Sequence, residues 1–262
     1  MSASRISAPL AAVVCVALVA AVPVGALSGA RPAAAVRAAS AGPSVQSMIV
    51  GSGGTIVSPA RSVNASATSV RVGRRSCVVA AGTPLAALAA VRRAGGPGFA
   101  IRDYGHCGAS PANSGELFVY SLAGEANSGQ NGWEYKVNDV AGATGAGDPS
   151  GPLGNGRRLS TGQRVLWFWC QAFSGGCQRT LELAAPASAA PGGSLTVTVS
   201  GHDNEGRGAP VAGAIVTLGS DFASTASDGR ATLIAPAAAG RYPVSASRPG
   251  LVPSFPETIE VR

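Results

Sequence analysis

Four cysteines limit how this chain can fold more than any other feature of the sequence. Cys77, Cys107, Cys170 and Cys177 remain when the apolar N-terminal segment, which holds Cys15, is set aside. An even number of cysteines in an exported chain predicts two disulfides, and four cysteines allow three connectivities. We favour Cys77 with Cys107 and Cys170 with Cys177, because the second pair brackets a short glycine-rich turn. In the chain-entropy model the two crosslinks contribute about 3.7 and about 2.5 kcal/mol to stability.

A metal site is the alternative use of these cysteines. The chain has no CxxC pair, and its two histidines, His106 and His202, lie far apart in sequence, whereas the usual zinc sites draw on closely spaced ligands. The loop Asp203–Glu205 offers three oxygen-bearing side chains, which suit Ca²⁺, but its spacing is not that of an EF-hand. We interpret this loop as a solvated hairpin tip. The sequence therefore predicts no metal and no cofactor.

The N-terminus has the layout of a secretory signal. Arg5 precedes a run from Pro9 to Leu27 in which every residue is apolar, Gly or Pro, and small residues follow. A charged start, an apolar stretch and a small-residue cleavage site define such signals. We expect a signal peptide over residues 1–35, a flexible leader over 36–48, and an extracellular mature protein. The alternative is an uncleaved N-terminus that holds the protein at the cell surface, since about 18 apolar residues can span a bilayer.

Composition and charge narrow the choice of partners. The chain is 46% hydrophobic but only 13% charged and 5% aromatic, with a formal net charge of +7. Its arginines are scattered, whereas a nucleic-acid interface is a clustered basic stripe on a recognisable module. We expect no nucleic-acid partner. No later apolar run is long enough for a membrane span, so we expect no membrane contact beyond the signal segment.

Residues 49–177 combine short strands with one helix. Thr83 as N-cap, Pro84 at the first helical position and an apolar stripe up to Gly95 predict a helix of about ten residues. Strands are expected at residues 55–57, 69–72, 77–79, 99–104, 117–121, 133–138 and 164–170. One helix on a mixed sheet makes this an α+β domain.

From residue 178 the pattern changes to short strands separated by turns. Strands are expected at residues 179–183, 194–199, 214–218, 231–234, 242–246 and 258–261. This spacing is typical of an antiparallel sandwich. We therefore expect an all-β domain over residues 178–262.

The aromatic residues point to a candidate binding surface. Ten of the thirteen lie between Phe99 and Phe173. Aromatic faces together with one amide suit stacking on a sugar, a peptide or a planar ring. The candidate ligand-binding residues are Trp133, Tyr135, Asn138, Trp167 and Trp169. The alternative is that the aromatic side chains fill the core and that Asn138 is a turn residue.

Residues 49–177 resemble the secreted β-grasp domains related to the C-terminal domain of transcobalamin. The resemblance rests on Gly82–Leu85, Gly132–Asn138, Gly145–Asp148 and Thr161–Trp167. It implies a β-grasp fold with the single helix on the sheet. In transcobalamin-like proteins this domain caps a corrinoid that is held against a separate helical barrel. These 262 residues contain no such barrel, so cobalamin capture by this chain alone is not the favoured interpretation.

Residues 179–262 look like a bacterial immunoglobulin-like or carboxypeptidase-regulatory-like domain. The resemblance rests on Pro210–Val216, Ser227–Ala231 and Gly240–Tyr242. It implies an immunoglobulin-like β-sandwich, which would carry the first domain as a spacer.

No arrangement of residues predicts an enzyme. The chain has no GxSxG nucleophile motif. A pair of carboxylates for glycoside hydrolysis could come from Glu116, Glu125, Glu134 and Asp148, but we expect these acids to be exposed. We therefore expect a secreted, non-catalytic binding or cell-surface interaction protein, whose extracellular ligand is a cell-wall glycan, a peptide or a planar small molecule. The alternative is a corrinoid-type carrier or accessory binding protein.

Overall fold

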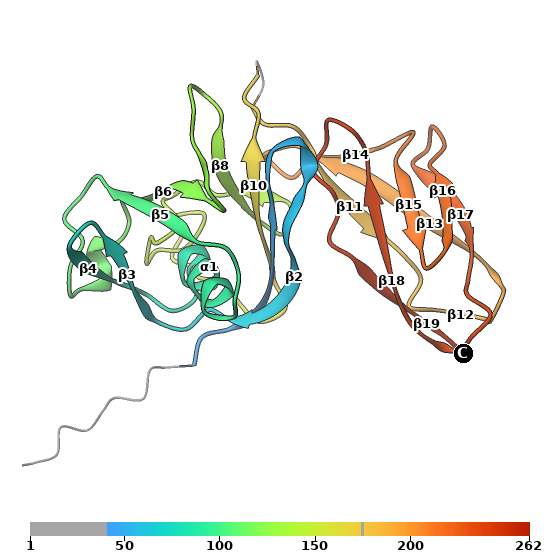
Figure 1. The fold of residues 1–262 in the computed structure, drawn as a ribbon, viewed down its shortest axis with the longest axis horizontal. Coiled ribbons are helices and arrows are strands. Elements are labelled where there is room, and N and C mark those ends of the chain that lie inside the picture. The colour runs from blue at the N-terminus through green and yellow to red at the C-terminus, as the bar shows by residue number, and fades with distance from the viewer. Residues whose placement is uncertain (1–40, 174–175) are drawn as a thin grey trace, which may run out of the picture. The chain divides into compact units, whose positions relative to one another are not determined.

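The computed structural model of the protein describes residues 41–173 and 176–262. The signal peptide expected over residues 1–35 lies outside the described residues. The described chain is mostly β, with several sheets and one α-helix (Figure 1). We call residues 44–170 the N-terminal region and residues 180–261 the C-terminal region.

The N-terminal region holds the helix and ten strands. Its helices are α1 (Pro84–Arg93) and the short 3-10 helices η1 (Ser52–Gly54) and η2 (Pro111–Asn113). Its strands are β1 (Ser44–Val50), β2 (Ile56–Asn64), β3 (Thr68–Val72), β4 (Arg75–Val79), β5 (Phe99–Asp103), β6 (Leu117–Leu122), β7 (Glu125–Ala126), β8 (Gly132–Val137), β9 (Val140–Ala141) and β10 (Arg164–Cys170).

The helix α1 begins and ends where the sequence predicts. The Thr83 side chain accepts a hydrogen bond from the Ala86 amide at 3.2 Å, which caps the first turn. Pro84 occupies the first helical position, where its missing N–H leaves no hydrogen bond unmade. The predicted apolar stripe is fully buried. The expected helix of about ten residues is confirmed.

A five-stranded mixed sheet in the order β2-β1-β10-β8-β9 lies at the centre of the N-terminal region. β1 runs parallel to β10, and the other neighbours are antiparallel. One face of this sheet packs against α1 (Figure 1). Because β8 and β10 alternate, this face carries the aromatic side chains Trp133, Tyr135, Trp167 and Trp169.

The other face of β10 is covered by the C-terminal region. Leu166 and Phe168 alternate with the tryptophans of β10 and pack with Val252 and Phe255 in a separate apolar cluster. Arg164 adds an ion pair to Glu257. A strand that is apolar on both faces is expected to be buried on both sides. α1 packs on one face of the sheet and the C-terminal region packs on the other.

Two disulfides complete the N-terminal region and the connection that follows it. Cys77 of β4 bonds to Cys107 in the loop after β5, and Cys170 at the end of β10 bonds to Cys177. The predicted connectivity is confirmed. The first disulfide joins the hairpin β3–β4 to the three-stranded sheet β5-β6-β7, so it ties two small sheets together.

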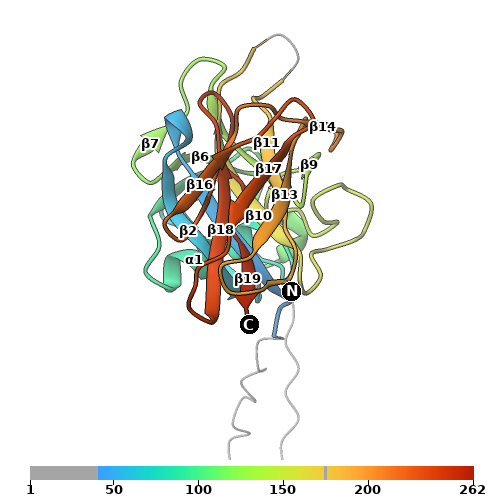
Figure 2. The ribbon, with the colours of Figure 1, turned by 90° about the vertical axis from the view of Figure 1, so that its right-hand side faces the viewer.

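The C-terminal region contains two sheets (Figure 2). Their buried side chains form an apolar core of their own. Its strands are β11 (Thr180–Ala184), β12 (Ser188–Ala189), β13 (Ser194–His202), β14 (Gly208–Pro210), β15 (Ile215–Leu218), β16 (Asp221–Ser224), β17 (Arg230–Ile234), β18 (Gly240–Ser247) and β19 (Glu257–Val261). One sheet has the order β11-β13-β14, with β17 also paired to β13, and the other has the order β12-β19-β18-β15-β16. The short-strand pattern predicted here is present.

One boundary differs from the prediction. The flexible leader was expected to reach residue 48, but β1 begins at Ser44 and pairs with both β2 and β10. The reason is tertiary: Val45 is buried in the core beneath α1, although its local sequence has no strand-like alternation. The prediction of a leader is therefore wrong for residues 44–48.

Candidate functional site

A small aromatic cavity lies between β6 and β8 in the N-terminal region. Its volume is about 200 Å³. The residues that line it are Leu117, Phe118, Val119, Trp133, Glu134, Tyr135, Gly142, Thr144, Gly145, Ala146 and Trp167. We call this space the aromatic cavity.

The cavity exists because one edge of β8 is only partly paired. β8 pairs with β10 along its whole length, but on its other side it pairs with β9 only at Lys136 and Val137. The rest of that edge faces β6, which belongs to a different sheet. At this edge the Tyr135 carbonyl accepts a hydrogen bond from the Gly142 amide at 3.0 Å, which holds the loop that closes one end of the cavity.

The wall of the cavity is fixed by the Tyr135 ring. This ring lies 5.4 Å from the Trp167 ring, centroid to centroid, and its hydroxyl donates to the Thr144 carbonyl at 2.8 Å. Gly142 is required beside it, because a Cβ at this position would lie 2.0 Å from the ring. The part of the wall formed by Tyr135 and Trp167 is therefore held by the core.

The groups in the cavity wall favour a mostly apolar ligand. The Trp167 Nε1 atom has no hydrogen-bond partner among the described residues, but it is buried and is therefore not offered to a ligand in the cavity. Burial raises the pKa of Tyr135 to about 12, so its phenol stays neutral and donates to Thr144. Burial also raises the pKa of Glu134, although this residue keeps contact with solvent.

Three of the five predicted site residues line the aromatic cavity: Trp133, Tyr135 and Trp167. Trp169 does not line it and packs behind Trp133, with ring centroids 5.7 Å apart in an edge-on arrangement. Asn138 lies in the turn after β8 with a φ of 54°, and its Oδ1 accepts from the Arg164 amide at 3.1 Å. Asn138 is thus a turn residue, as the alternative interpretation expected.

Sequence reasoning missed the opposite wall of the cavity. Phe118 and Val119 come from β6, and Thr144 to Ala146 come from the loop after β9. Only the run of small residues from Gly142 to Gly147 hinted that a side chain packs closely against this loop. The contact between β6 and β8 joins strands of different sheets, so no local pattern reports it.

The four acids considered for glycoside hydrolysis lie in three different places. Glu134 lines the aromatic cavity, whereas Glu116 and Asp148 line a separate cavity of about 450 Å³ together with His106. Asp148 accepts hydrogen bonds from the amide and hydroxyl of Ser150, as a turn residue does. Glu125 accepts from the Ser52 amide at 3.2 Å.

In the loop considered for Ca²⁺, the carboxylate of Asp203 accepts hydrogen bonds from the backbone of the loop itself. Asp203 Oδ1 accepts from the amides of Glu205 and Arg207 at 3.1 and 2.8 Å, and these bonds lower the pKa of Asp203. This is the geometry of a hairpin tip.

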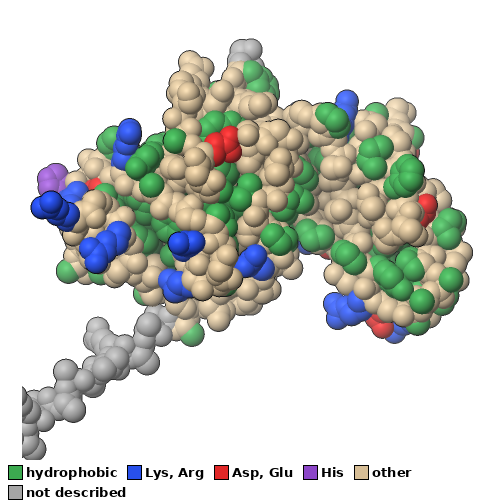
Figure 3. Space-filling model, viewed as in Figure 1, with side chains coloured by type: hydrophobic (Ala, Val, Ile, Leu, Met, Phe, Trp, Pro, Cys, Tyr) green, Lys and Arg blue, Asp and Glu red, His purple; other side chains and the backbone are tan. Residues whose placement is uncertain are grey.

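Three further observations bear on location and partners. Over residues 41–173 and 176–262, no helix combines the length and the hydrophobicity that a bilayer crossing requires. Two disulfides are compatible with an extracellular location. On the face seen in Figure 3 the basic side chains stand in separate groups.

Comparison of the chain with protein-family models, with curated proteins and with solved structures finds no match. The resemblances to the transcobalamin-related and immunoglobulin-like domains rest on sequence motifs alone.

Proposed function

We propose that the protein is a secreted, non-catalytic binding protein that takes up a ring-shaped group of an extracellular ligand in the aromatic cavity. The observation that carries this proposal is the aromatic lining of the cavity, whose wall includes Trp133, Tyr135 and Trp167. Aromatic side chains offer flat apolar faces on which a planar or sugar ring can stack.

We further propose that residues 44–177 form a β-grasp-like domain and residues 178–262 an immunoglobulin-like spacer. The first assignment is supported by one helix that packs on a five-stranded mixed sheet. The second is supported by two antiparallel-rich sheets that share one apolar core. Secretion is supported by the two disulfides and by the signal-like N-terminal sequence.

The size of the aromatic cavity favours a single ring over a whole corrinoid. Pockets that enclose drug-sized ligands measure about 300 to 1,000 Å³, whereas this cavity measures about 200 Å³. A glycan or a peptide can insert one ring and leave the rest of its length outside. The corrinoid carrier is kept as the competing outcome of the experiment below.

Isothermal titration calorimetry of the full chain tests the proposal with three ligands. These are chitotetraose, the capped peptide acetyl-Gly-Phe-Gly-amide, and hydroxocobalamin. We expect saturable binding of the glycan or of the peptide. No binding of any of the three, or binding of hydroxocobalamin alone, would overturn the proposal.

A matched pair of variants locates the binding site. Phe118 lines the cavity and Phe222 lies on β16 in the C-terminal region, and both side chains are exposed, so Phe→Ala at either position spares the core. Phe118→Ala should weaken binding at least tenfold, because it removes one aromatic wall, while Phe222→Ala should bind as the wild type does. Equal affinities of the two variants would place the ligand elsewhere. Turnover of the glycan that disappears in Glu116→Gln would refute the non-catalytic assignment.

A further inference from the structure

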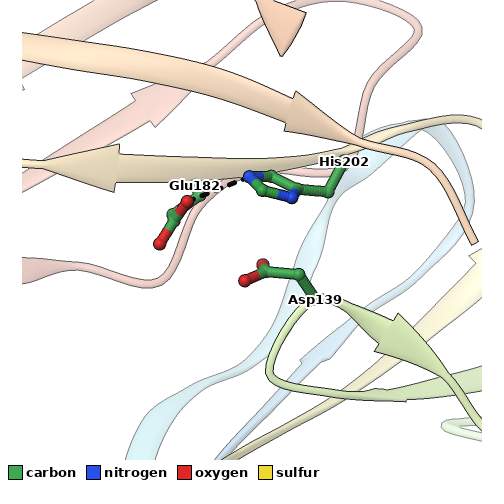
Figure 4. Close-up of side chains that lie close together, drawn as sticks. All are labelled: Asp139, Glu182 and His202. Carbon is green, nitrogen blue, oxygen red and sulfur yellow. Dashed lines mark ion pairs between the residues drawn. The ribbon is translucent and has the colours of Figure 1, made fainter. Parts of the chain in front are cut away.

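Three metal-ligating side chains from three separate strands or turns meet at the contact between the two regions. They are Asp139 in the turn between β8 and β9, Glu182 in β11 and His202 at the end of β13. One ligand atom from each lies within 4.8 Å of the other two. Figure 4 shows the carboxylates of Asp139 and Glu182 directed toward the space beside the imidazole of His202.

Strand register explains why these residues meet. In the β11–β13 ladder Glu182 is opposite Ser200, so His202, two residues farther along, lies on the same face as a diagonal neighbour. Asp139 is brought to this face by the N-terminal region, because Val140 bridges to Glu205. The Ala141 amide also donates to the Asn204 carbonyl at 2.9 Å. The cluster is therefore set by backbone pairing.

The imidazole of His202 is oriented as it is in a metal ligand. Its Nδ1 lies 3.1 Å from the Gly206 carbonyl, which can only accept, so Nδ1 carries the hydrogen and the neutral ring has its lone pair on Nε2. Nε2 is buried, and although Glu182 Oε2 lies 2.9 Å away, the two atoms are not aligned as a hydrogen bond. Metal-binding histidines commonly donate their second nitrogen to a carbonyl in this way.

No Lys or Arg of the described residues forms an ion pair with the carboxylates of the cluster. Asp139 forms no ion pair, and the one basic group within 4.0 Å of Glu182 is the imidazole of His202, which is charged only if it is protonated. The nearby ammonium of Lys136 donates instead to the Thr180 hydroxyl and to the backbone carbonyls of His202 and Asp203. Both carboxylates thus keep oxygen atoms available for an ion.

We propose that Asp139, Glu182 and His202 form a Zn²⁺ site that links the N-terminal and C-terminal regions. One imidazole nitrogen and two carboxylate oxygens suit Zn²⁺, whereas Ca²⁺ and Mg²⁺ select sites made of oxygen alone. Tetrahedral Zn²⁺ with bonds of about 2.1 Å separates its donor atoms by about 3.4 Å. Each donor-to-donor separation, now at most 4.8 Å, therefore needs to shrink by about 1.4 Å at most, and the half-exposed side chain of Glu182 is able to move by that much.

Titration of the EDTA-treated full chain with ZnCl₂ tests this proposal by calorimetry. We expect one equivalent of Zn²⁺ to bind, and Ca²⁺ to bind far more weakly. His202→Asn should weaken Zn²⁺ binding at least a hundredfold, and Glu182→Gln at least tenfold. The matched controls, His106→Asn and Glu260→Gln, alter the only other histidine and an exposed glutamate of β19, and both should bind Zn²⁺ as the wild type does.

A second measurement keeps the test valid if a variant fails to fold. The chain has only two histidines, so ¹⁵N-histidine labelling gives two imidazole spectra in the wild-type protein. Zn²⁺ should shift the Nε2 resonance of His202 and leave His106 unchanged. The proposal is overturned if no stoichiometric binding occurs, if the His106 resonance shifts instead, if Ca²⁺ binds more tightly than Zn²⁺, or if Glu182→Gln binds Zn²⁺ with unchanged affinity.

Discussion

The single lysine of the chain makes the stability of the protein depend on pH in a way that can be measured cleanly. Lys136 is fully buried, and its ammonium donates to the Thr180 hydroxyl and the carbonyls of His202 and Asp203 at 2.6 to 3.1 Å. Burial is the main cause that lowers its pKa from 10.5 to about 8, against the opposing effect of Asp139 and other nearby acids. The charged form is therefore less favourable in the folded protein than in the unfolded chain.

The sign of the pH dependence follows from these two pKa values. Below pH 8 Lys136 is protonated in both states, and its contribution does not change with pH. Between pH 8 and 10.5 the unfolded chain holds the proton that the folded protein has lost, so the free energy of unfolding rises with pH. At 1.36 kcal/mol per pH unit the rise is about 3 kcal/mol over the full window. Tyr135, whose pKa is raised from 10.0 to about 12, opposes it above pH 10, because its folded form keeps a proton that the unfolded chain loses.

Guanidinium unfolding at pH 7, 8, 9 and 10, followed by tryptophan fluorescence, measures this rise. EDTA is present so that no metal ion at His202 contributes. We expect the wild type to gain about 2 to 3 kcal/mol between pH 8 and 10. Lys136→Met should show a flat profile, because no other lysine exists to titrate in this window. A flat or falling wild-type profile, or the same rise in Lys136→Met, would refute the argument.

Two further predictions concern the crosslinks and the cavity wall. Replacing Cys77 and Cys107 by serine should lower the free energy of unfolding by about 3.7 kcal/mol, and replacing Cys170 and Cys177 by about 2.5 kcal/mol. The first loss is larger because its bonded residues are 30 positions apart in sequence and those of the second are 7 apart. Denaturant titration measures both losses, and the reverse order would contradict the chain-entropy reasoning. Gly142→Ala should lower the free energy of unfolding by about 1 to 3 kcal/mol, because the added Cβ would clash with the Tyr135 ring. Gly108→Ala should lower it far less, because the space around Gly108 is open. Equal thermal melting temperatures of the two variants would show that the loop carrying Gly142 moves to accommodate the Cβ.

The elements that local rules govern could be predicted from the sequence. Thr83 and Pro84 fix the start of α1 through the first-turn amides alone. The alternation of Trp167 with Leu166 and Phe168 correctly indicates a strand covered on both faces. The disulfide pairing followed from loop length and from the even cysteine count.

Features that depend on distant pairing could not be predicted. β1 is a strand because it inserts between β2 and β10, with a parallel partner more than a hundred residues away. The aromatic cavity requires β6 and β8 to face each other without pairing. His202 was set aside as a metal ligand because the other histidine is distant in sequence, yet its neighbours are carboxylates that arrive through the β11–β13 register and the turn after β8.

The aromatic cavity and the proposed Zn²⁺ site can be tested separately because different residues form them. Phe118 and Trp167 belong to the N-terminal region, so a change at either leaves the β11–β13 ladder intact. Glu182 belongs to β11 and lies outside the aromatic cavity. β8 and the turn after it contribute to both sites, because β8 carries Tyr135 in the wall of the cavity and the turn carries Asp139 of the proposed Zn²⁺ site. A variant that abolished both ligand and Zn²⁺ binding would therefore report damage to β8 itself, whereas loss of one with retention of the other assigns the loss to its own site.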